Sequence, residues 1–260
     1  MAEPALEVVD VSKTFKIPHE QRATFREHVL HPLRRTTFER NEALKEVSVT
    51  VEQGEFFGVI GANGSGKSTL LKLMAGIYTP TSGHVRVHGK LSPFIELGVG
   101  FNPELTGREN IRVNATLLGL TKRELQARFE DIVEFAELER FMDLKLKNYS
   151  TGMSLRLGYS IAIHVPFEIL LLDEVLAVGD RQFARKCYAT FDRFKEERQT
   201  MVFVSHDLPS VEKWCDRAAY LEAGRLVALG PSDEVCELYR ARTGGAAQPD
   251  AQQESLAAAH

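Results

Sequence analysis

The chain has 260 residues, of which 43% are hydrophobic and 26% are charged, a composition typical of a globular protein with one sizeable core. Its formal charge of −4 disfavours a dedicated nucleic-acid binder, because that class usually needs a strong basic excess. No apolar run approaches the roughly 20 residues of a membrane span, and we expect no secretory signal at the N-terminus. The three cysteines, at positions 187, 215 and 236, show no pair spacing and predict a reducing compartment.

The apolar runs predict strands in two groups. Leu6–Val11 and Val47–Val51 are predicted strands of an antiparallel N-terminal lobe. Three later runs are continuously apolar and end in polar residues, which is typical of buried parallel strands that deliver functional groups at their carboxyl ends. These runs are 56–60, 169–172 and 201–204, and helical patterns lie between them at 70–75, 122–138 and 154–165. The sequence therefore predicts an α/β fold with a parallel sheet.

Two segments do not fit a compact domain. Residues 16–40 hold six Lys or Arg against three Asp or Glu, and Phe25 and Val29 stand four residues apart before Pro32. This pattern predicts a short amphipathic basic helix that docks on a membrane face or a partner, with a solvated loop as the alternative. Residues 243–260 are small or polar, and we expect them to form a disordered tail.

The strongest motif is Gly-Ala-Asn-Gly-Ser-Gly-Lys-Ser-Thr, residues 61–69, between a predicted strand and a predicted helix. This is the phosphate-binding P-loop pattern in its required context. Glycines let backbone N–H groups surround phosphate oxygens, and the helix N-terminus adds positive charge. We expect Lys67 to reach the β and γ phosphates and Ser68 to ligate Mg²⁺. The predicted nucleotide-binding residues here are Gly61, Asn63, Gly64, Ser65, Gly66, Lys67, Ser68 and Thr69.

A second site narrows the chemistry to ATP hydrolysis. The apolar run 169–172 ends in Asp173 and Glu174. A carboxylate at the end of such a strand is placed near the Mg²⁺ shell, which is the role expected of Asp173. Glu174 is then positioned to polarise the attacking water, and this is the task of a hydrolase rather than a kinase.

The segment Ser150-Thr151-Gly152-Met153 lies about twenty residues before Asp173 and opens a predicted helix. It resembles the middle of the Leu-Ser-Gly-Gly-Gln signature of the ABC ATPase family, with Thr151 and Met153 as departures. The resemblance implies that Ser150 and Gly152 meet the γ-phosphate of ATP held by the opposite subunit. A helix N-terminus with a hydroxyl and a glycine suits an anion, although a plain N-capped helix is the alternative.

Further positions carry the same resemblance. His206, after the apolar run 201–204, matches the family's switch histidine, which contacts the γ-phosphate and orients the water. Asp180 resembles the D-loop aspartate that couples the two sites. Phe15 occupies the place of the aromatic residue that stacks on adenine, with a core phenylalanine as the alternative.

The clearest departure is the family's lobe-linking glutamine, which is absent before Pro103. Glu96 is the first candidate to replace it, and Asn102 is the second. A carboxylate at Glu96 could still reach Mg²⁺ or water, and a solvated residue at a strand end is the alternative.

Three features together are similar to the ATPase subunits of bacterial polysaccharide exporters, of the O-antigen and teichoic-acid type. They are the basic segment 16–42, the run 96–110 and Tyr-Ser-Thr-Gly-Met at 149–153. The resemblance spans about Leu6–Arg242 and implies one nucleotide-binding domain over 1–242. That domain has a RecA-like parallel-sheet core, an antiparallel β lobe and a helical signature subdomain at about 104–165. The basic segment then resembles a gate helix, in which Arg22, Arg26, Arg34 and Arg35 suit anionic headgroups.

This resemblance implies a homodimer that sandwiches two ATP·Mg²⁺ and works with a separate transmembrane permease on a lipid-linked polysaccharide. The expected location is peripheral, on the cytoplasmic face of the inner membrane, with no nucleic-acid partner. About 30 residues follow Leu229, so we expect no appended carbohydrate-binding domain. The alternatives are a soluble ABC ATPase of translation or DNA repair, and an ABC exporter of another substrate. The single P-loop disfavours the two-cassette translation type.

Overall fold

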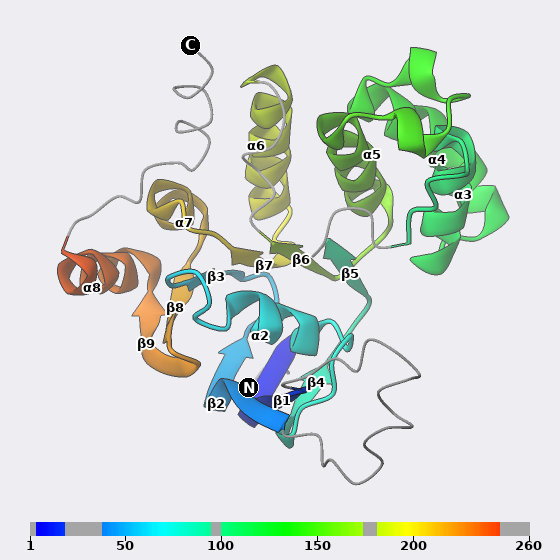
Figure 1. The fold of residues 1–260 in the computed structure, drawn as a ribbon. Helices are drawn as coiled ribbons and strands as arrows, with labels where there is room; N and C mark the ends of the chain where they lie inside the picture. The colour runs from blue at the N-terminus through cyan, green and yellow to red at the C-terminus, as the bar shows by residue number, and fades with distance from the viewer. Residues whose placement is uncertain (1–3, 19–37, 95–99, 174–180, 245–260) are drawn as a thin grey trace, which may run out of the picture.

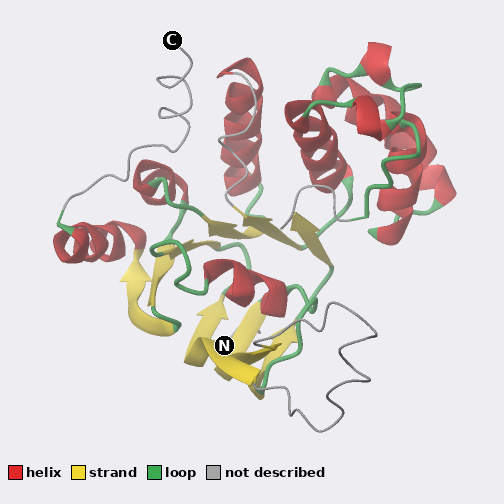
Figure 2. Cartoon of the chain, in the orientation of Figure 1, coloured by secondary structure: helices red, strands yellow, loops and turns green. Residues whose placement is uncertain are grey.

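The computed structural model describes residues 4–18, 38–94, 100–173 and 181–244. Two sheets and a cluster of helices make up this part of the chain (Figures 1 and 2). The smaller sheet is antiparallel, in the order β2-β1-β4. Its strands are β1 (Leu6–Pro18), β2 (Phe38–Val51) and β4 (Ser82–Val87).

Strands β1 and β2 are longer than the sequence predicts. Their ladder continues outward to Lys16 opposite Arg40 and to Pro18 opposite Phe38. Both ends of the basic segment 16–42 are therefore strand rather than helix or loop, because each end finds its hydrogen-bonding partner in the other. The helix predicted around Phe25 lies outside the described residues.

The larger sheet has the order β5-β6-β7-β3-β8-β9. Strands β5, β6, β7, β3 and β8 are parallel to one another, and β9 pairs antiparallel with β8. The strands are β5 (Leu91–Phe94), β6 (Ile169–Asp173), β7 (Thr200–Val204), β3 (Phe56–Ile60), β8 (Arg217–Glu222) and β9 (Arg225–Pro231). The predicted α/β class with a parallel-sheet core and an antiparallel lobe is confirmed.

Two hydrophobic cores cover the two faces of the larger sheet. Along β3, Phe57 and Val59 pack against helix α2 (Lys67–Met74) and the antiparallel sheet. Phe56 and Ile60 face the opposite way, because successive side chains of a strand alternate. That second core is closed by four helices, α5 (Thr151–His164), α6 (Arg181–Glu196), α7 (Leu208–Trp214) and α8 (Ser232–Thr243). In Figure 2, α2 lies between the two sheets and the other helices lie beyond the larger one.

A third core lies within the helical cluster, which we define as α3 (Gly107–Leu117), α4 (Lys122–Ala136), the short 3₁₀ turns Glu139–Phe141 and Leu146–Asn148, and α5. Thr106 and Thr121 begin α3 and α4 with capping boxes, which satisfy N–H groups that a helix start leaves open. Helix α4 ends two residues before the predicted Leu138, because Glu137 adopts a left-handed φ of 57°.

At the C-terminal end, Thr243 belongs to α8 and not to the predicted tail, and Gly244 ends the helix with a φ of 72°. The remaining residues of that tail lie outside the described ranges. Within those ranges, no helix combines the length and the apolar character that crossing a bilayer requires.

Candidate functional site

The carboxyl ends of three neighbouring parallel strands gather the predicted residues at one edge of the larger sheet. The P-loop follows β3, Asp173 ends β6, and His206 follows β7. Strand β7 lies between β6 and β3. In open α/β sheets the crevice outside these strand ends is where ligands bind. The strand order therefore brings a phosphate loop, a carboxylate and a histidine to one edge.

Backbone geometry explains the glycines of the P-loop. Gly61, Gly64 and Gly66 have φ values of 149°, 77° and 108°, which L side chains rarely adopt. A Cβ at Gly61 would lie 2.3 Å from the Leu221 carbonyl oxygen, and one at Gly66 would lie 2.7 Å from the Ala43 carbonyl oxygen. Gly66 is also the N-cap of α2 and supplies no side-chain cap. The first N–H groups of α2 are therefore left for an anion.

Lys67 is buried, with 6% of its surface exposed. Its ammonium donates hydrogen bonds to the carbonyl oxygens of Gly61 at 2.8 Å and Ala62 at 3.1 Å. Burial lowers the pKa of this ammonium, and the Asp173 carboxylate opposes that shift. A buried cation held by neutral carbonyls and near one carboxylate is poised to gain from an added anion.

A cleft of about 520 Å³ contains most of the predicted nucleotide-binding residues. Phe15 lies in its wall together with Asn63, Gly64, Gly66, Lys67, Ser68 and Thr69. Sequence reasoning missed six further lining residues, from β2 and from the turn after β8. They are Asn41, Glu42, Ala43, Lys45, Ala223 and Gly224.

The β8–β9 turn ties the P-loop to β2. Ala223 and Gly224 have φ values of 48° and 79°, the left-handed pair of a two-residue type I′ hairpin. The Gly224 N–H donates to the Ser65 carbonyl at 3.0 Å, and its carbonyl accepts from the Lys45 N–H at 2.8 Å. A Cβ at Gly224 would lie 2.7 Å from the Ala43 carbonyl oxygen. An Ala-Gly pair between two strand patterns could have signalled this turn, but its distant contacts could not be anticipated.

Phe15 is half-buried and belongs to none of the three cores. Its ring meets that of Tyr78 edge-on, with centroids 5.4 Å apart. The Lys13 ammonium lies 5.1 Å from the Phe15 ring centroid. The Phe15 side chain therefore forms part of the cleft wall, where it packs against Tyr78 and Lys13, and does not lie in the protein interior.

His206 is exposed just before α7. The preceding Ser205 is buried, and its N–H donates to the Val59 carbonyl at 3.3 Å. The Ser205 hydroxyl in turn accepts from the Asp207 N–H at 3.0 Å. The backbone on both sides of His206 is thus fixed against β3, while its side chain stays accessible.

The signature segment lies apart from this cleft. Ser150 is the N-cap of α5, and its hydroxyl accepts a hydrogen bond from the Met153 N–H at 3.2 Å. Ser150 is therefore an N-cap within its own chain. Gly152 is different, because a Cβ there would meet only the Ser150 hydroxyl, at 3.9 Å. Neither residue lines the cleft that holds Lys67, so nothing described within the chain requires glycine at this position.

Of the two candidates for the missing glutamine, the structure describes Asn102. The Asn102 side-chain oxygen accepts from the Glu104 N–H at 2.9 Å, so it is used in a local turn. Fully buried Asn110, which sequence reasoning missed, holds the same loop: its amide accepts from the Asn102 N–H and donates to the Asn102 carbonyl oxygen at 3.0 Å. An asparagine next to apolar Ile111, on the buried face of α3, would have been the signal. Glu96, Glu174 and Asp180 lie outside the described residues.

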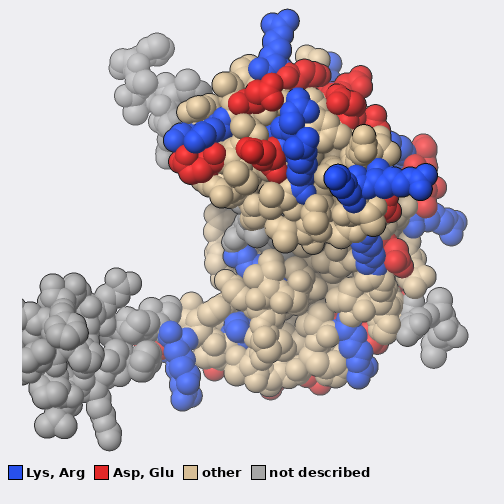
Figure 3. Space-filling view, turned by 90° about the vertical axis from the view of Figure 1, so that its right-hand side faces the viewer, with Lys and Arg blue, Asp and Glu red and all other residues tan. Residues whose placement is uncertain are grey.

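Charges of both signs cover the face of the molecule that carries the helical cluster (Figure 3). Glu104 pairs with Lys145 and Lys147 at 3.2 and 3.1 Å, and Arg108 pairs with Asp143 at 3.4 Å. These contacts are exposed and contribute little to stability. Their alternation of sign gives this face no single-sign field.

A sequence profile described as ABC transporter matches residues 44–177, just over half of the chain. This chain belongs to the ABC transporter family. It is an ABC ATPase of the group that includes O-antigen and teichoic-acid export proteins, so the resemblance inferred from the motifs is confirmed.

Relatives in this group cover between 76% and 92% of this chain. The O-antigen export system ATP-binding protein RfbB of Klebsiella pneumoniae is 44% identical over 92% of this chain and 98% of the relative. RfbB of Myxococcus xanthus is 43% identical over 91% of this chain but 55% of the relative. The teichoic acids export ATP-binding protein TagH of Enterococcus faecalis is 46% identical over 76% of this chain and 44% of the relative. The chain therefore spans about half the length of the latter two.

Solved ABC cassettes share the fold. One, an ATP-binding cassette in a dimeric post-hydrolysis state with ADP and Pi, superposes with a TM-score of 0.71 at 23% identity and covers 87% of this chain and 98% of that one. An ATP-binding subunit of an ABC transporter gives a TM-score of 0.70 at 25% identity, with 92% and 93% covered.

Proposed function

We propose that this ABC ATPase hydrolyses ATP to drive export of a lipid-linked polysaccharide through a separate transmembrane permease. It would work as a peripheral subunit on the cytoplasmic face of the membrane. The observation that carries the proposal is 44% identity to an O-antigen export ATP-binding protein over 98% of that relative. The cleft geometry supports the nucleotide part independently, because a glycine-lined helix N-terminus and a buried lysine suit phosphate.

The triphosphate would lie along the P-loop. Lys67, Ser68 and Thr69 line the cleft at the start of α2, and the loop glycines leave room for phosphate oxygens. The Ser68 hydroxyl and the Asp173 carboxylate are hard oxygen donors of the kind that Mg²⁺ prefers, so these residues fit the ion, with Glu96 as a further contact. Mg²⁺ would neutralise charge on the β and γ phosphates.

The other proposed site residues would orient the adenine base and the attacking water. Phe15 would stack on adenine from its place in the cleft wall. Glu174 would accept a hydrogen bond from the attacking water, and His206 would contact the γ-phosphate and hold that water. The water oxygen would bond to the γ-phosphorus as the bond to the β–γ bridging oxygen breaks, with ADP as the leaving group and the water proton passing to the Glu174 carboxylate. Catalysis would come from positioning and charge stabilisation. Asp180 would couple this step to the second site.

A second copy would complete the site. Ser150 and Gly152 do not line the cleft of their own chain, which fits a role at the ATP of the opposite copy. Two ATP molecules sandwiched between two copies would close the dimer, because contacts to the γ-phosphate across the interface exist only in the closed state. Hydrolysis would reopen it.

The relay to the permease would use Glu96 rather than Asn102. The Asn102 side-chain oxygen already accepts a hydrogen bond from the Glu104 N–H, so moving the Asn102 side chain would break the hydrogen bond of a local turn. Glu96 carries the charge that can respond to Mg²⁺ or water.

Replacing Glu174 by Gln tests the hydrolytic assignment. We expect ATP binding and ATP-dependent dimer closure to persist, while steady-state turnover falls by about 100-fold or more. ATP binding, dimer mass and phosphate release are measured on the same preparation. Glu130→Gln is the matched control, because Glu130 is an exposed carboxylate on α4. Normal turnover in Glu174→Gln would refute the assignment.

Transport is tested in inverted membrane vesicles that contain the chain and its permease. Reversing the charges of Arg34 and Arg35 should impair polysaccharide export and spare basal ATP hydrolysis, since the basic segment would contact anionic headgroups. Unchanged export would contradict that contact. Loss of export in Glu174→Gln with normal membrane association is expected if hydrolysis drives transport.

A further inference from the structure

Asn41 stands beside the aromatic side chain proposed to stack on adenine. In the β1–β2 ladder, Asn41 is the direct partner of Phe15. Directly opposite residues of an antiparallel pair share one face of the sheet, with Cβ atoms roughly 5 Å apart. Both side chains line the cleft that also contains Asn63 and Lys67. An amide therefore flanks the place where a base would lie on the Phe15 ring.

An irregularity in β2 fixes this placement. Lys13 pairs with Leu44 and Thr14 pairs with Glu42, so Ala43 is an extra residue in the ladder. Such bulges bend a strand and re-aim side chains, and they are common beside functional sites. The Ala43 carbonyl oxygen lies 2.7 Å from the positions where Gly66 and Gly224 would carry a Cβ. The strand that carries Asn41 is thus packed directly on the P-loop and cannot slide relative to the phosphates.

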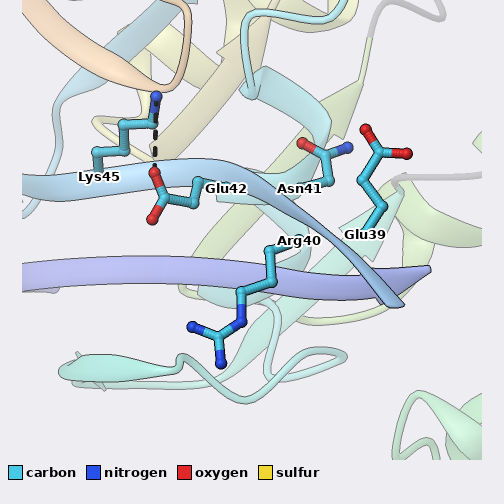
Figure 4. Close-up of a pocket in the computed structure, with 5 residues that line it drawn as sticks. All are labelled: Glu39, Arg40, Asn41, Glu42 and Lys45. Carbon is cyan, nitrogen blue, oxygen red and sulfur yellow. Dashed lines mark ion pairs between the residues drawn. The ribbon is translucent and has the colours of Figure 1, made fainter. Parts of the chain in front are cut away.

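Of the β2 side chains drawn in Figure 4, Asn41, Glu42 and Lys45 line the cleft, whereas Glu39 and Arg40 do not. Glu39 and Asn41 point to one side of β2, and Arg40 points to the other (Figure 4). Glu42 forms an ion pair with Lys45 at 3.9 Å. Asn41 lies where the nucleotide cleft meets a neighbouring hollow lined by Glu39, Arg40, Asn41, Glu42 and Lys45. Asn41 is exposed, and within the described ranges its amide makes no hydrogen bond, so both its donor and its acceptor are available.

We infer that Asn41 selects adenine by hydrogen bonding to the N6/N7 edge of the base. This inference rests on the proposed function, because it needs a nucleotide stacked on Phe15. An amide offers one donor and one acceptor group. Adenine presents the N6 donor and the N7 acceptor at this edge, and this pair matches the amide in both places. Guanine presents O6 and N7, which are both acceptors, so the amide can satisfy guanine only once.

Binding measurements on three nucleotides test the assignment without requiring turnover. Calorimetric dissociation constants are compared for ATP, GTP and 7-deaza-ATP, which lacks the N7 acceptor. The wild-type chain should bind ATP about tenfold more tightly than either analogue, and Asn41→Ala should bring all three within about twofold by weakening ATP binding. Arg40→Ala should keep the wild-type ratios, because that side chain points to the other side of the same strand.

The outcomes separate this inference from the proposed function. Equal binding of the three nucleotides by the wild-type chain, or wild-type ratios in Asn41→Ala, overturns the role of Asn41 and leaves ATP hydrolysis standing. Selective binding that Asn41→Ala abolishes, in a chain that releases no phosphate, supports Asn41 and overturns hydrolysis. Failure to bind any of the three nucleotides overturns both.

Discussion

Two helix N-termini carry the proposed anion contacts of this protein, and they are built in opposite ways. At the start of α2, the N-cap Gly66 has no side-chain cap, and a Cβ added there would meet the Ala43 carbonyl oxygen and the Leu44 side chain. At the start of α5, Ser150 caps the helix itself, and Gly152 faces open space apart from that hydroxyl. The first terminus is enclosed by its own chain, whereas the second is open and, under the proposed function, would contact the ATP of the other copy.

The open terminus is nevertheless held firmly. Arg156 of α5 forms an ion pair with Glu137 at 3.2 Å, and Lys186 of α6 pairs with the same carboxylate at 2.8 Å. Glu137 therefore links the helical cluster to a helix that packs on the larger sheet. Gly152 is thus unconstrained by its own chain, whereas the helix that carries it is fixed by ion pairs. This combination is expected of a residue that contacts another copy.

The largest effect should follow the loss of the buried ammonium at the enclosed terminus. Lys67→Ala removes the buried cation that donates hydrogen bonds to the carbonyl oxygens of the loop, and we expect ATP turnover to fall by about 100- to 1000-fold. Steady-state phosphate release measures the change. Lys122→Ala, at an exposed lysine that begins α4, should retain wild-type turnover. Comparable losses of turnover in Lys67→Ala and Lys122→Ala would contradict the proposed role of the Lys67 ammonium at the start of α2.

Gly66→Ala tests whether the N-terminus of α2 is packed too tightly for a side chain at its N-cap. A Cβ would lie 2.7 Å from the Ala43 carbonyl oxygen and 2.8 Å from Leu44 Cδ2, at a φ of 108°. We expect a loss of about 2 kcal/mol in unfolding free energy and weaker ATP binding. Urea denaturation measures the stability. Gly76→Ala is the control, since Gly76 has a φ of 70° with nothing within 4 Å. An equal loss in both variants would assign the cost to φ alone.

Gly152→Ala tests the open terminus and should show the reverse pattern. Alanine is the better helix former by about 1 kcal/mol, and no described atom obstructs its Cβ. We therefore expect unchanged or higher thermal stability. ATP turnover should fall about tenfold, as one good contact is lost from the interface between copies. Unchanged turnover would contradict the proposed contact of Gly152 with the other copy. Lower stability would show that Gly152 has a role within its own chain.

The smallest effect should come from a contact that serves neither terminus. Glu212 of α7 pairs with Arg240 of α8, with Arg240 Nη2 donating at 2.8 Å, and this hydrogen bond lowers the pKa of the Glu212 carboxyl from 4.5. Because the folded pKa is the lower one, the stabilisation is present above pH 4.5 and is lost as pH falls through the folded value. Glu212→Gln should cost less than about 1 kcal/mol at pH 7 and leave turnover unchanged.

The pH dependence of urea unfolding checks this last prediction. The difference between the wild-type chain and Glu212→Gln should shrink as pH falls below about 4.5 and vanish once the carboxyl is protonated in both states. A difference that stayed constant with pH would mean that shape, and not charge, sets the contribution of Glu212.

Sequence alone determined the features that depend on near neighbours. The P-loop conformation follows from glycine spacing at 61–66, and the cap at Ser150 follows from a hydroxyl just before a helical pattern. Continuous apolar runs located β3, β6 and β7 within one residue of their observed ends. These features are local because steric limits on φ and first-turn hydrogen bonds involve only a few successive residues.

The tertiary structure decided which distant segments of the chain are neighbours. The order β6-β7-β3 set Asp173 and His206 beside the P-loop. The turn at Gly224, far along the chain, bonds to Ser65, and a single extra residue at Ala43 set which β2 side chain stands opposite Phe15. Register and strand order arise from packing of two sheets on α2, a long-range competition among many pairings that no short segment encodes. The residues proposed to hold phosphate were therefore readable in the sequence, as was Phe15 through the family resemblance, while the β2 residues beside Phe15 in the cleft wall were not.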